Sequence, residues 1–183
     1  MVRSDPDQAT ADEGEHFAET ADEARSGWEQ TLQDMELMAA DREDAGYDTL
    51  TLPGVDTTPK SPDTGDTDEW GLSYIVADNQ LEELEAFDTG IEFDGTAVYQ
   101  AESAGHGFIV TECVDSDADR ILFVAGTYQL RHAGPLVRTA VDREEMYTHI
   151  KRLGGTTVQT VYHSEAEPFF PNPDRLLSYE GGI

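Results

Sequence analysis

The stretch His106–Thr127 constrains the fold of this chain more than any other part of the sequence. Two apolar runs, Phe108–Val110 and Ile121–Ala125, flank the polar segment Asp115–Asp119. Two apolar runs around a short polar turn are typical of a β-hairpin. The run Ile121–Ala125 contains no polar residue, which favours a central strand buried on both faces. The sequence therefore predicts a sheet built around this hairpin.

A long amphipathic helix is expected ahead of this sheet, over residues 15–46. Apolar residues recur there at steps of three and four, and Gly46 stands where a helix-ending glycine belongs. The apolar stripe of the helix includes Phe17, Trp28, Leu32 and Met35. Such a stripe packs against the chain's own sheet, or it associates with a second copy of the chain or with a partner protein. The sequence leaves these alternatives open.

Composition and periodicity divide the rest of the chain. Residues 1–14 are acidic and without periodicity, which predicts disorder. Residues 47–69 begin with a short strand and continue as a loop rich in Pro, Asp and Thr, whereas residues 166–183 form a Pro-rich tail without regular structure. Phe169 and Phe170 in this tail are expected to lie against the domain, because an exposed pair would promote aggregation. Residues 70–165 are expected to form an α+β domain.

Short elements are expected around the hairpin within that domain. They are strands at 70–77, 96–101 and 156–162 and short helices at 78–90 and 142–153. For residues 128–141 the pattern allows either a strand or a helical turn. In sum, the sequence predicts an α+β fold with a long N-terminal amphipathic helix, followed by a mainly antiparallel sheet with two shorter helices.

The net charge of −28 is the most unusual property of the composition. Acidic residues number 39 against 11 basic ones, and the chain has just two lysines, Lys60 and Lys151. Such a charge destabilises the compact state through self-repulsion, which concentrated salt screens. The composition therefore predicts a halophilic protein of a salty cytoplasm, as in haloarchaea. A mimic of nucleic acid, or a protein that binds basic proteins, is the alternative.

Several classes of site are not expected. The single cysteine, Cys113, excludes an internal disulfide and a cysteine-based zinc site, and its position in a strand indicates a buried apolar role. No apolar run is long enough to span a membrane, and the first residues lack the apolar stretch of a signal peptide, so a cytoplasmic location is expected. Direct binding of DNA or RNA is not expected, because binding through phosphate contacts weakens steeply as salt rises.

Known motifs give no catalytic residue, cofactor or metal ligand. The segment Asp115–Asp119 has the alternating acids of a calcium loop, but Arg120 replaces the required glycine and Gly126 replaces the final glutamate. A solvated turn is therefore expected there. Ser103 and His106 lie three residues apart without a nucleophile elbow, so His106 is interpreted as a turn residue.

A local inversion of charge marks the candidate site. The window 120–152 carries six basic and three acidic residues within this strongly acidic chain. Arginine and histidine together suit an anionic ligand or a carboxylate of a partner. The candidate ligand-binding or partner-binding residues are Arg131, His132, Arg138, His149 and His163. The alternative interpretation is that these arginines form internal salt bridges with the abundant acids.

These observations support three hypotheses about function. The first is a non-enzymatic binding module that associates through its N-terminal helix and binds a partner or a small anion near Arg131, His132 and Arg138. The second is an enzyme of unknown class that uses His132, His149 or His163 for acid–base chemistry, which requires these side chains to meet in one pocket. The third is an assembly component whose helix is its whole function.

Several segments also resemble a family of uncharacterised haloarchaeal proteins, a domain of unknown function. The segments are Leu130–Ala133, Met146–His149, Gly155–Thr156, His163 ahead of Phe169–Pro171, the helix around Trp28, and Asp66–Asp68. The resemblance covers most of the chain and implies no activity. It agrees with the halophilic interpretation of the charge.

Overall fold

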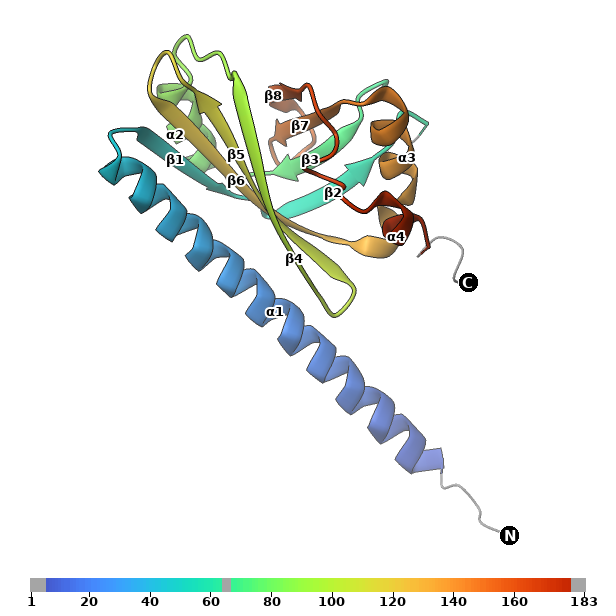
Figure 1. Cartoon of the computed structure of the whole chain (residues 1–183). Helices are drawn as coiled ribbons and strands as arrows, with labels where there is room; N and C mark the ends of the chain where they lie inside the picture. Colours follow the sequence, from blue (N-terminus) through green and yellow to red (C-terminus); the bar gives the residue numbers. More distant parts are fainter. Residues whose placement is uncertain (1–5, 64–66, 179–183) are drawn as a thin grey trace.

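The computed structural model describes residues 6–63 and 67–178, with the backbone alone for residues 6–17. The elements along this part of the chain are α1 (Pro6–Asp44), β1 (Asp48–Pro53), β2 (Asp56–Lys60), β3 (Gly71–Ile75), α2 (Asp78–Phe87), β4 (Gly95–Ser103), β5 (His106–Asp115), β6 (Arg120–Gln129), the 3-10 turn η1 (Leu130–His132), α3 (Gly134–Arg143), β7 (Met146–Lys151), β8 (Thr157–His163) and α4 (Pro173–Ser178). A long N-terminal helix followed by strands and shorter helices confirms the predicted α+β class (Figure 1).

The strands form two sheets, whereas the sequence analysis expected one. The first sheet has the order β1-β6-β5-β4 and the second sheet has the order β2-β3-β7-β8. Most neighbouring strands are antiparallel, but β1 runs parallel to β6 and β3 runs parallel to β7. Periodicity identifies strands without showing which sheet each one joins, because pairing depends on contacts between distant residues.

The predicted hairpin is confirmed as the centre of the first sheet. β5 and β6 pair over their whole length, and the turn between them falls within Asp115–Asp119 as expected. Each residue of Ile121–Ala125 is at most 1% exposed, so the strand is buried on both faces. The two faces of β6 belong to different apolar clusters, since Leu122 and Val124 face the second sheet while Phe123 faces α1.

Three layers follow from these two clusters. The main core lies between the two sheets and includes Leu52 of the first sheet and Leu72, Tyr74 and Ile150 of the second. A smaller core joins α1 to the opposite face of the first sheet. The order of layers is therefore α1, first sheet and second sheet (Figure 1). The face of the second sheet that points away from the main core is called the outer face below.

α1 is longer than the sequence analysis expected. It begins at Pro6, so residues 6–14, expected to be disordered, belong to the helix. Proline is well suited to the first position of a helix, and Ala, Glu and Gln are strong helix formers. Residues 1–5 of the segment expected to be disordered lie outside the described residues. Gly46, at a φ of 101°, follows the end of the helix as predicted.

The apolar stripe of α1 packs on the first sheet in the half of the helix that lies over the sheet. Met35 is 1% exposed, and Trp28 and Leu32 are partly buried in the same cluster. For these three residues the packing alternative therefore holds. Phe17, the fourth residue of the predicted stripe, has its side chain outside the described part of the structure.

The helix predicted at residues 142–153 is wrong. The structure places α3 earlier, at Gly134–Arg143, with Pro135 in its first turn, and residues 146–151 form β7. The sequence pattern allowed both structures, because Met146 and Ile150 also lie on one face of a strand. In β7 they face the main core, whereas His149 faces the other way. The undecided segment 128–141 is thus the end of β6, η1 and most of α3.

Two further expectations of irregular structure are wrong. The predicted loop after Pro53 contains the edge strand β2, which pairs with β3. Pro59 fits there because an edge strand tolerates a residue without an N–H group. The Pro-rich tail contains α4, where Pro173 occupies the first helical position. Phe169 and Phe170 are buried in the main core, as predicted.

Candidate ligand-binding site

The structure places the predicted site residues in four separate environments. Arg131 and His132 lie on η1 and are exposed. Arg138 lies on the exposed side of α3, in a shallow depression with Asp142 and Arg143. His149 points to the outer face from β7, and His163 points into the core from β8. The three histidines of the enzyme hypothesis therefore do not meet in one pocket.

His163 is held as a structural residue inside the protein. It is 2% exposed, and its Nδ1 and Nε2 atoms lie 2.7 Å and 2.8 Å from the hydroxyl oxygens of Thr96 and Thr148. Its ring also contacts Phe169, with 4.8 Å between the ring centroids. Burial lowers the pKa of His163 to about 4, so the imidazole is neutral near pH 7. Both ring nitrogens are occupied and are not available to a ligand.

Cys113 has the buried role that the sequence predicted. Its side chain is fully enclosed in the main core between the two sheets. Burial raises the pKa of its thiol to about 12, so the thiolate does not form near neutral pH.

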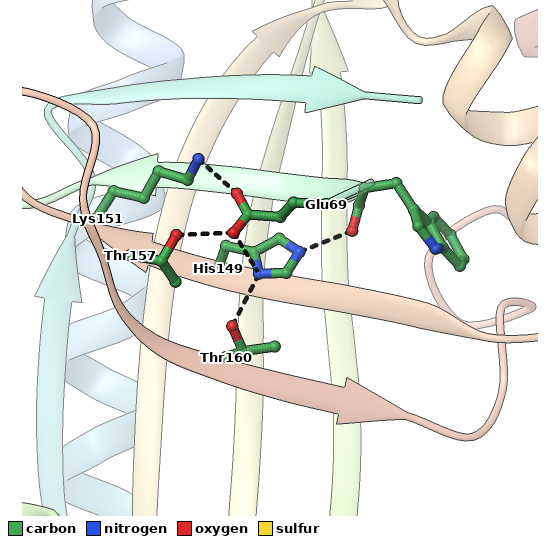
Figure 2. Close-up of polar contacts among 6 residues, drawn as sticks. Glu69, His149, Lys151, Thr157 and Thr160 are labelled. Carbon is green, nitrogen blue, oxygen red and sulfur yellow. Dashed lines mark hydrogen bonds and ion pairs between the residues drawn. The ribbon is translucent and has the colours of Figure 1, made fainter. Parts of the chain in front are cut away.

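A polar network on the outer face holds His149 in place (Figure 2). Its Nε2–H group donates to the backbone carbonyl of Trp70 at 2.7 Å, which fixes the tautomer. The Thr160 hydroxyl lies 2.9 Å from the other nitrogen, Nδ1, and the carboxylate of Glu69 lies 3.8 Å from it. His149 therefore has partners at both nitrogens while it is neutral.

Glu69 is the negative centre of this network. Lys151 Nζ lies 2.5 Å from Glu69 Oε1, and the Thr157 hydroxyl donates to Oε2 at 2.8 Å (Figure 2). Burial alone would raise the pKa of Glu69, but the hydrogen bonds from Lys151 and Thr157 outweigh it, so the pKa lies below its usual value. For His149, burial lowers the pKa, and this effect is larger than the opposing effects of the hydrogen bond to Trp70 and the charge of Glu69. The network thus contains a carboxylate, an ammonium group and a neutral imidazole.

A pocket of about 610 Å³ lies beside the edge strand β2. All five residues of β2 line it on one side. The residues that line it from other elements are His106, Thr127, Tyr128, Gln129 and His132. Of the predicted site residues, His132 lines this pocket. Arg131 is adjacent to it, because its Nε donates a hydrogen bond of 2.7 Å to the side chain of Gln129, which lines the pocket. The pocket is called the β2 pocket below.

The polar groups of the β2 pocket have unused hydrogen-bonding capacity. His106 uses one nitrogen, Nδ1, in a 3.2 Å contact with the carbonyl of Ala104. Thr57 is 6% exposed, and its hydroxyl has no hydrogen-bond partner among the described residues. The Thr127 hydroxyl is buried and equally without a partner there. A buried hydroxyl without a partner is costly, so these groups favour a bound polar molecule.

Sequence reasoning missed three residues of this region. The sequence predicts a turn residue at His106, but the structure places it at the first position of β5, directly after the turn, where it lines the pocket. Thr57 lay in a segment expected to be a loop. Lys60 carried a usable signal, because it is one of two lysines in a chain otherwise depleted of lysine.

Other site types find no support in the described structure. No three His, Cys, Asp or Glu side chains lie close enough in the described ranges to hold a metal ion together. Within the same ranges, no helix has the length and apolar character needed to cross a membrane.

Comparison with known proteins assigns the chain to a family. A model of a family of unknown function, DUF7529, matches residues 14–171. The chain belongs to DUF7529. No curated protein and no solved structure shows significant similarity to the chain. The matched residues include both the β2 pocket and the network around Glu69.

Proposed function

We propose that this protein is a non-enzymatic binding module that holds a small hydroxylated organic acid in the β2 pocket. The observation that carries the proposal is the meeting of two imidazoles, His106 and His132, with the buried and unpartnered hydroxyl of Thr57 in one pocket. Imidazole and hydroxyl groups both donate and accept hydrogen bonds, so they suit a ligand that carries hydroxyl and carboxylate groups.

The charge around the pocket supports an anionic ligand. Among the residues that line it, Asp56 is the one acidic side chain, while Lys60 borders the pocket and Arg131 stands beside Gln129. The chain as a whole carries a net charge of −28. The pocket therefore avoids the repulsion that an anion meets elsewhere on such a protein.

Melting temperature in the presence of candidate ligands tests the proposal. The probes are glycolate, malate, citrate and gluconate, each compared with potassium chloride at the same ionic strength. We expect at least one probe to raise the melting temperature of the natural chain, because a ligand that binds the folded state stabilises it. The rise should shrink strongly in His132→Ala and in Thr57→Val.

Thr111→Val provides a matched control. Thr111 is also buried, with its hydroxyl near that of Tyr74, but it does not line the pocket. Thr57→Val should leave the ligand-free chain as stable as before, or more stable by about 1 kcal/mol, because no hydrogen bond is lost, and Thr111→Val should lower its stability by no more than about 1 kcal/mol. Of the two valine variants, only Thr57→Val should show a smaller rise in melting temperature with the probe. No rise with any probe, or an equal rise in all variants, would refute the proposal.

The length of α1 favours a second candidate function, association of two copies of the chain. The N-terminal part of α1 extends past the two sheets (Figure 1), whereas at Gly27 the helix contacts Phe108 of β5. A helical segment that extends beyond the sheets is only marginally stable in water on its own, so pairing with the same segment of a second copy would stabilise it.

The mass of the protein in solution tests this second candidate. Light scattering in about 2 M KCl would compare the full chain with a chain that begins at Ser26, since concentrated salt screens the repulsion between acidic helices. A dimeric full chain and a monomeric shortened chain are expected. Two monomers would remove the second candidate and leave the first one standing.

A further inference from the structure

Both lysines of the chain meet on the outer face of the second sheet. Lys60 lies on β2 and Lys151 lies on β7, and these strands flank β3 on its two sides. Their registers place Lys60 opposite Gly71 and Lys151 opposite Ile75, so both side chains project from the same face of the sheet. In a chain with so few lysines, this meeting is a specific feature of the face.

The carboxylate of Glu69 forms an ion pair with Lys151, and its charge also influences Lys60. Lys151 Nζ contacts Glu69 Oε1 at 2.5 Å. Among residues 18–63 and 67–178, no other carboxylate lies within ion-pair distance of Lys151, and none lies within that distance of Lys60. Two ammonium groups are therefore balanced by one carboxylate, which leaves a net charge of one positive unit among these three groups.

The surplus charge has an energetic cost that a second anion would relieve. Burial and the nearby ammonium of Lys151 lower the pKa of Lys60, and the charge of Glu69 opposes this only in part. Lowering the pKa of a lysine means that its charged form is disfavoured where it stands. A negative group placed between the two lysines would reverse this effect.

Ser73 supplies a third group on the same face. It lies in the middle of β3, in register with Thr58 of β2 and with His149 of β7. Ser73 is 5% exposed, and its hydroxyl has no hydrogen-bond partner within the described part of the chain. His149 itself is not available, since both its nitrogens have partners (Figure 2).

We infer that Lys60, Lys151 and Ser73 form an oxyanion site, here called the lysine site, that binds a phosphate group. Two ammonium groups and a hydroxyl give charge-assisted hydrogen bonds to a tetrahedral oxyanion. The lysine site borders the β2 pocket, because Lys60 also lines that pocket, but it lies on a different face of β2 from Thr57. It does not depend on the function proposed for the pocket.

Calorimetric titration with inorganic phosphate near neutral pH and at constant ionic strength tests the lysine site. Lys60→Gln should weaken binding about tenfold or more, because a charge-assisted contact is lost. Ser73→Ala should weaken it by a smaller factor. Arg152→Gln is the matched control, since Arg152 is exposed and pairs with the exposed Glu85, and it should leave binding unchanged.

Glu69→Gln gives a result that damage to the fold would not produce. This substitution removes the competing carboxylate, so phosphate should bind more tightly than to the natural chain. Weaker binding in Glu69→Gln, equal binding in Lys60→Gln, or no binding to the natural chain would overturn the inference. His132→Ala and Thr57→Val should bind phosphate as the natural chain does, and a loss there would show that the anion occupies the β2 pocket instead.

A parallel titration with glycerol 3-phosphate separates two sources of the phosphate group. Tighter binding than that of inorganic phosphate would indicate a phosphate ester as the ligand. Equal or weaker binding would indicate the free ion. In both cases Lys60→Gln must reduce the affinity for the inference to hold.

Discussion

The buried imidazole of His163 links the stability of the protein to pH. Its pKa is about 4 in the folded chain against 6.5 for an exposed histidine, because burial disfavours the charged ring. Between these two values the unfolded chain takes up a proton that the folded chain does not. The contribution of His163 to stability is therefore complete above pH 6.5 and is lost as the pH falls towards 4.

His163→Gln should remove this part of the pH dependence. The amide can still pair with the hydroxyls of Thr96 and Thr148, but it does not titrate. As the pH falls from the upper to the lower of the two pKa values, the free energy of unfolding of the natural chain should decrease by at most about 3 kcal/mol more than that of the variant. Chemical unfolding at a series of pH values measures the difference. Parallel curves for the two chains would show that His163 does not carry the effect.

An asymmetric ion pair fixes the C-terminal half of α1 to the first sheet. Arg42 Nε donates to Glu112 Oε1 at 2.8 Å, and the Tyr99 hydroxyl donates to the other carboxylate oxygen at 3.0 Å. The side chain of Glu112 is 4% exposed, whereas that of Arg42 is 42% exposed. Losing one partner therefore has unequal consequences, since Arg42 can turn to water and Glu112 cannot.

Arg42→Met should destabilise the fold more than Glu112→Gln. The first substitution leaves a buried carboxylate that keeps just the hydrogen bond from Tyr99, at a cost of about 1–3 kcal/mol. The second leaves a neutral acceptor in the same place and should cost less. The free energy of unfolding of both variants measures this order. Equal costs, or the reverse order, would contradict the described role of Glu112.

Packing of α1 on the first sheet gives a second prediction for this element. Met35→Ala should cost about 2–5 kcal/mol, because Met35 fills the smaller core beneath the helix. Leu37→Ala is the control, since Leu37 is 66% exposed, and its effect should stay within about 0.5 kcal/mol. Similar effects of the two substitutions on chemical unfolding would mean that the helix does not pack as described.

Elements with one dominant pattern could be predicted from the sequence, and ambiguous ones could not. The uninterrupted apolar run of β6 and the helical repeat of α1 each allow one structure. β7 was predicted as a helix, because the spacing of Met146 and Ile150 fits both periods and its place between β3 and β8 decides the outcome. The Thr and Pro residues of β2 indicate a loop from the sequence, because they form a strand only in the presence of the neighbouring strand β3.

The candidate site was predicted only in part for a related reason. The excess of basic residues between 120 and 152 pointed to His132 and Arg131, which lie at the β2 pocket. It also pointed to His163, which the alternation of β8 turns into the core. A count of charges does not show the face on which a side chain lies. The remaining polar residues of the pocket come from β2 on one side and from β5 and β6 on the other, which lie far apart in the sequence.

The net charge of −28 leads to a prediction for the whole molecule in salt. Repulsion between surface acids extends over about 10 Å in 0.1 M salt and over about 3 Å in 1 M salt. The melting temperature should therefore rise steadily as KCl increases over this range, and NaCl should have a similar effect. A melting temperature that falls with added salt would mean that attraction between opposite charges, rather than repulsion, dominates the folded state.

The most direct test of the central claim is an NMR titration of the five histidine side chains with each of the four probes, glycolate, malate, citrate and gluconate. The imidazole C–H signals report separately on the β2 pocket, the outer face and the core. Binding in the β2 pocket predicts that, with at least one probe, the signals of His106 and His132 move together with a common affinity, while those of His149 and His163 stay in place. Stationary signals of His106 and His132 with all four probes, or movement confined to the other histidines, would contradict the account.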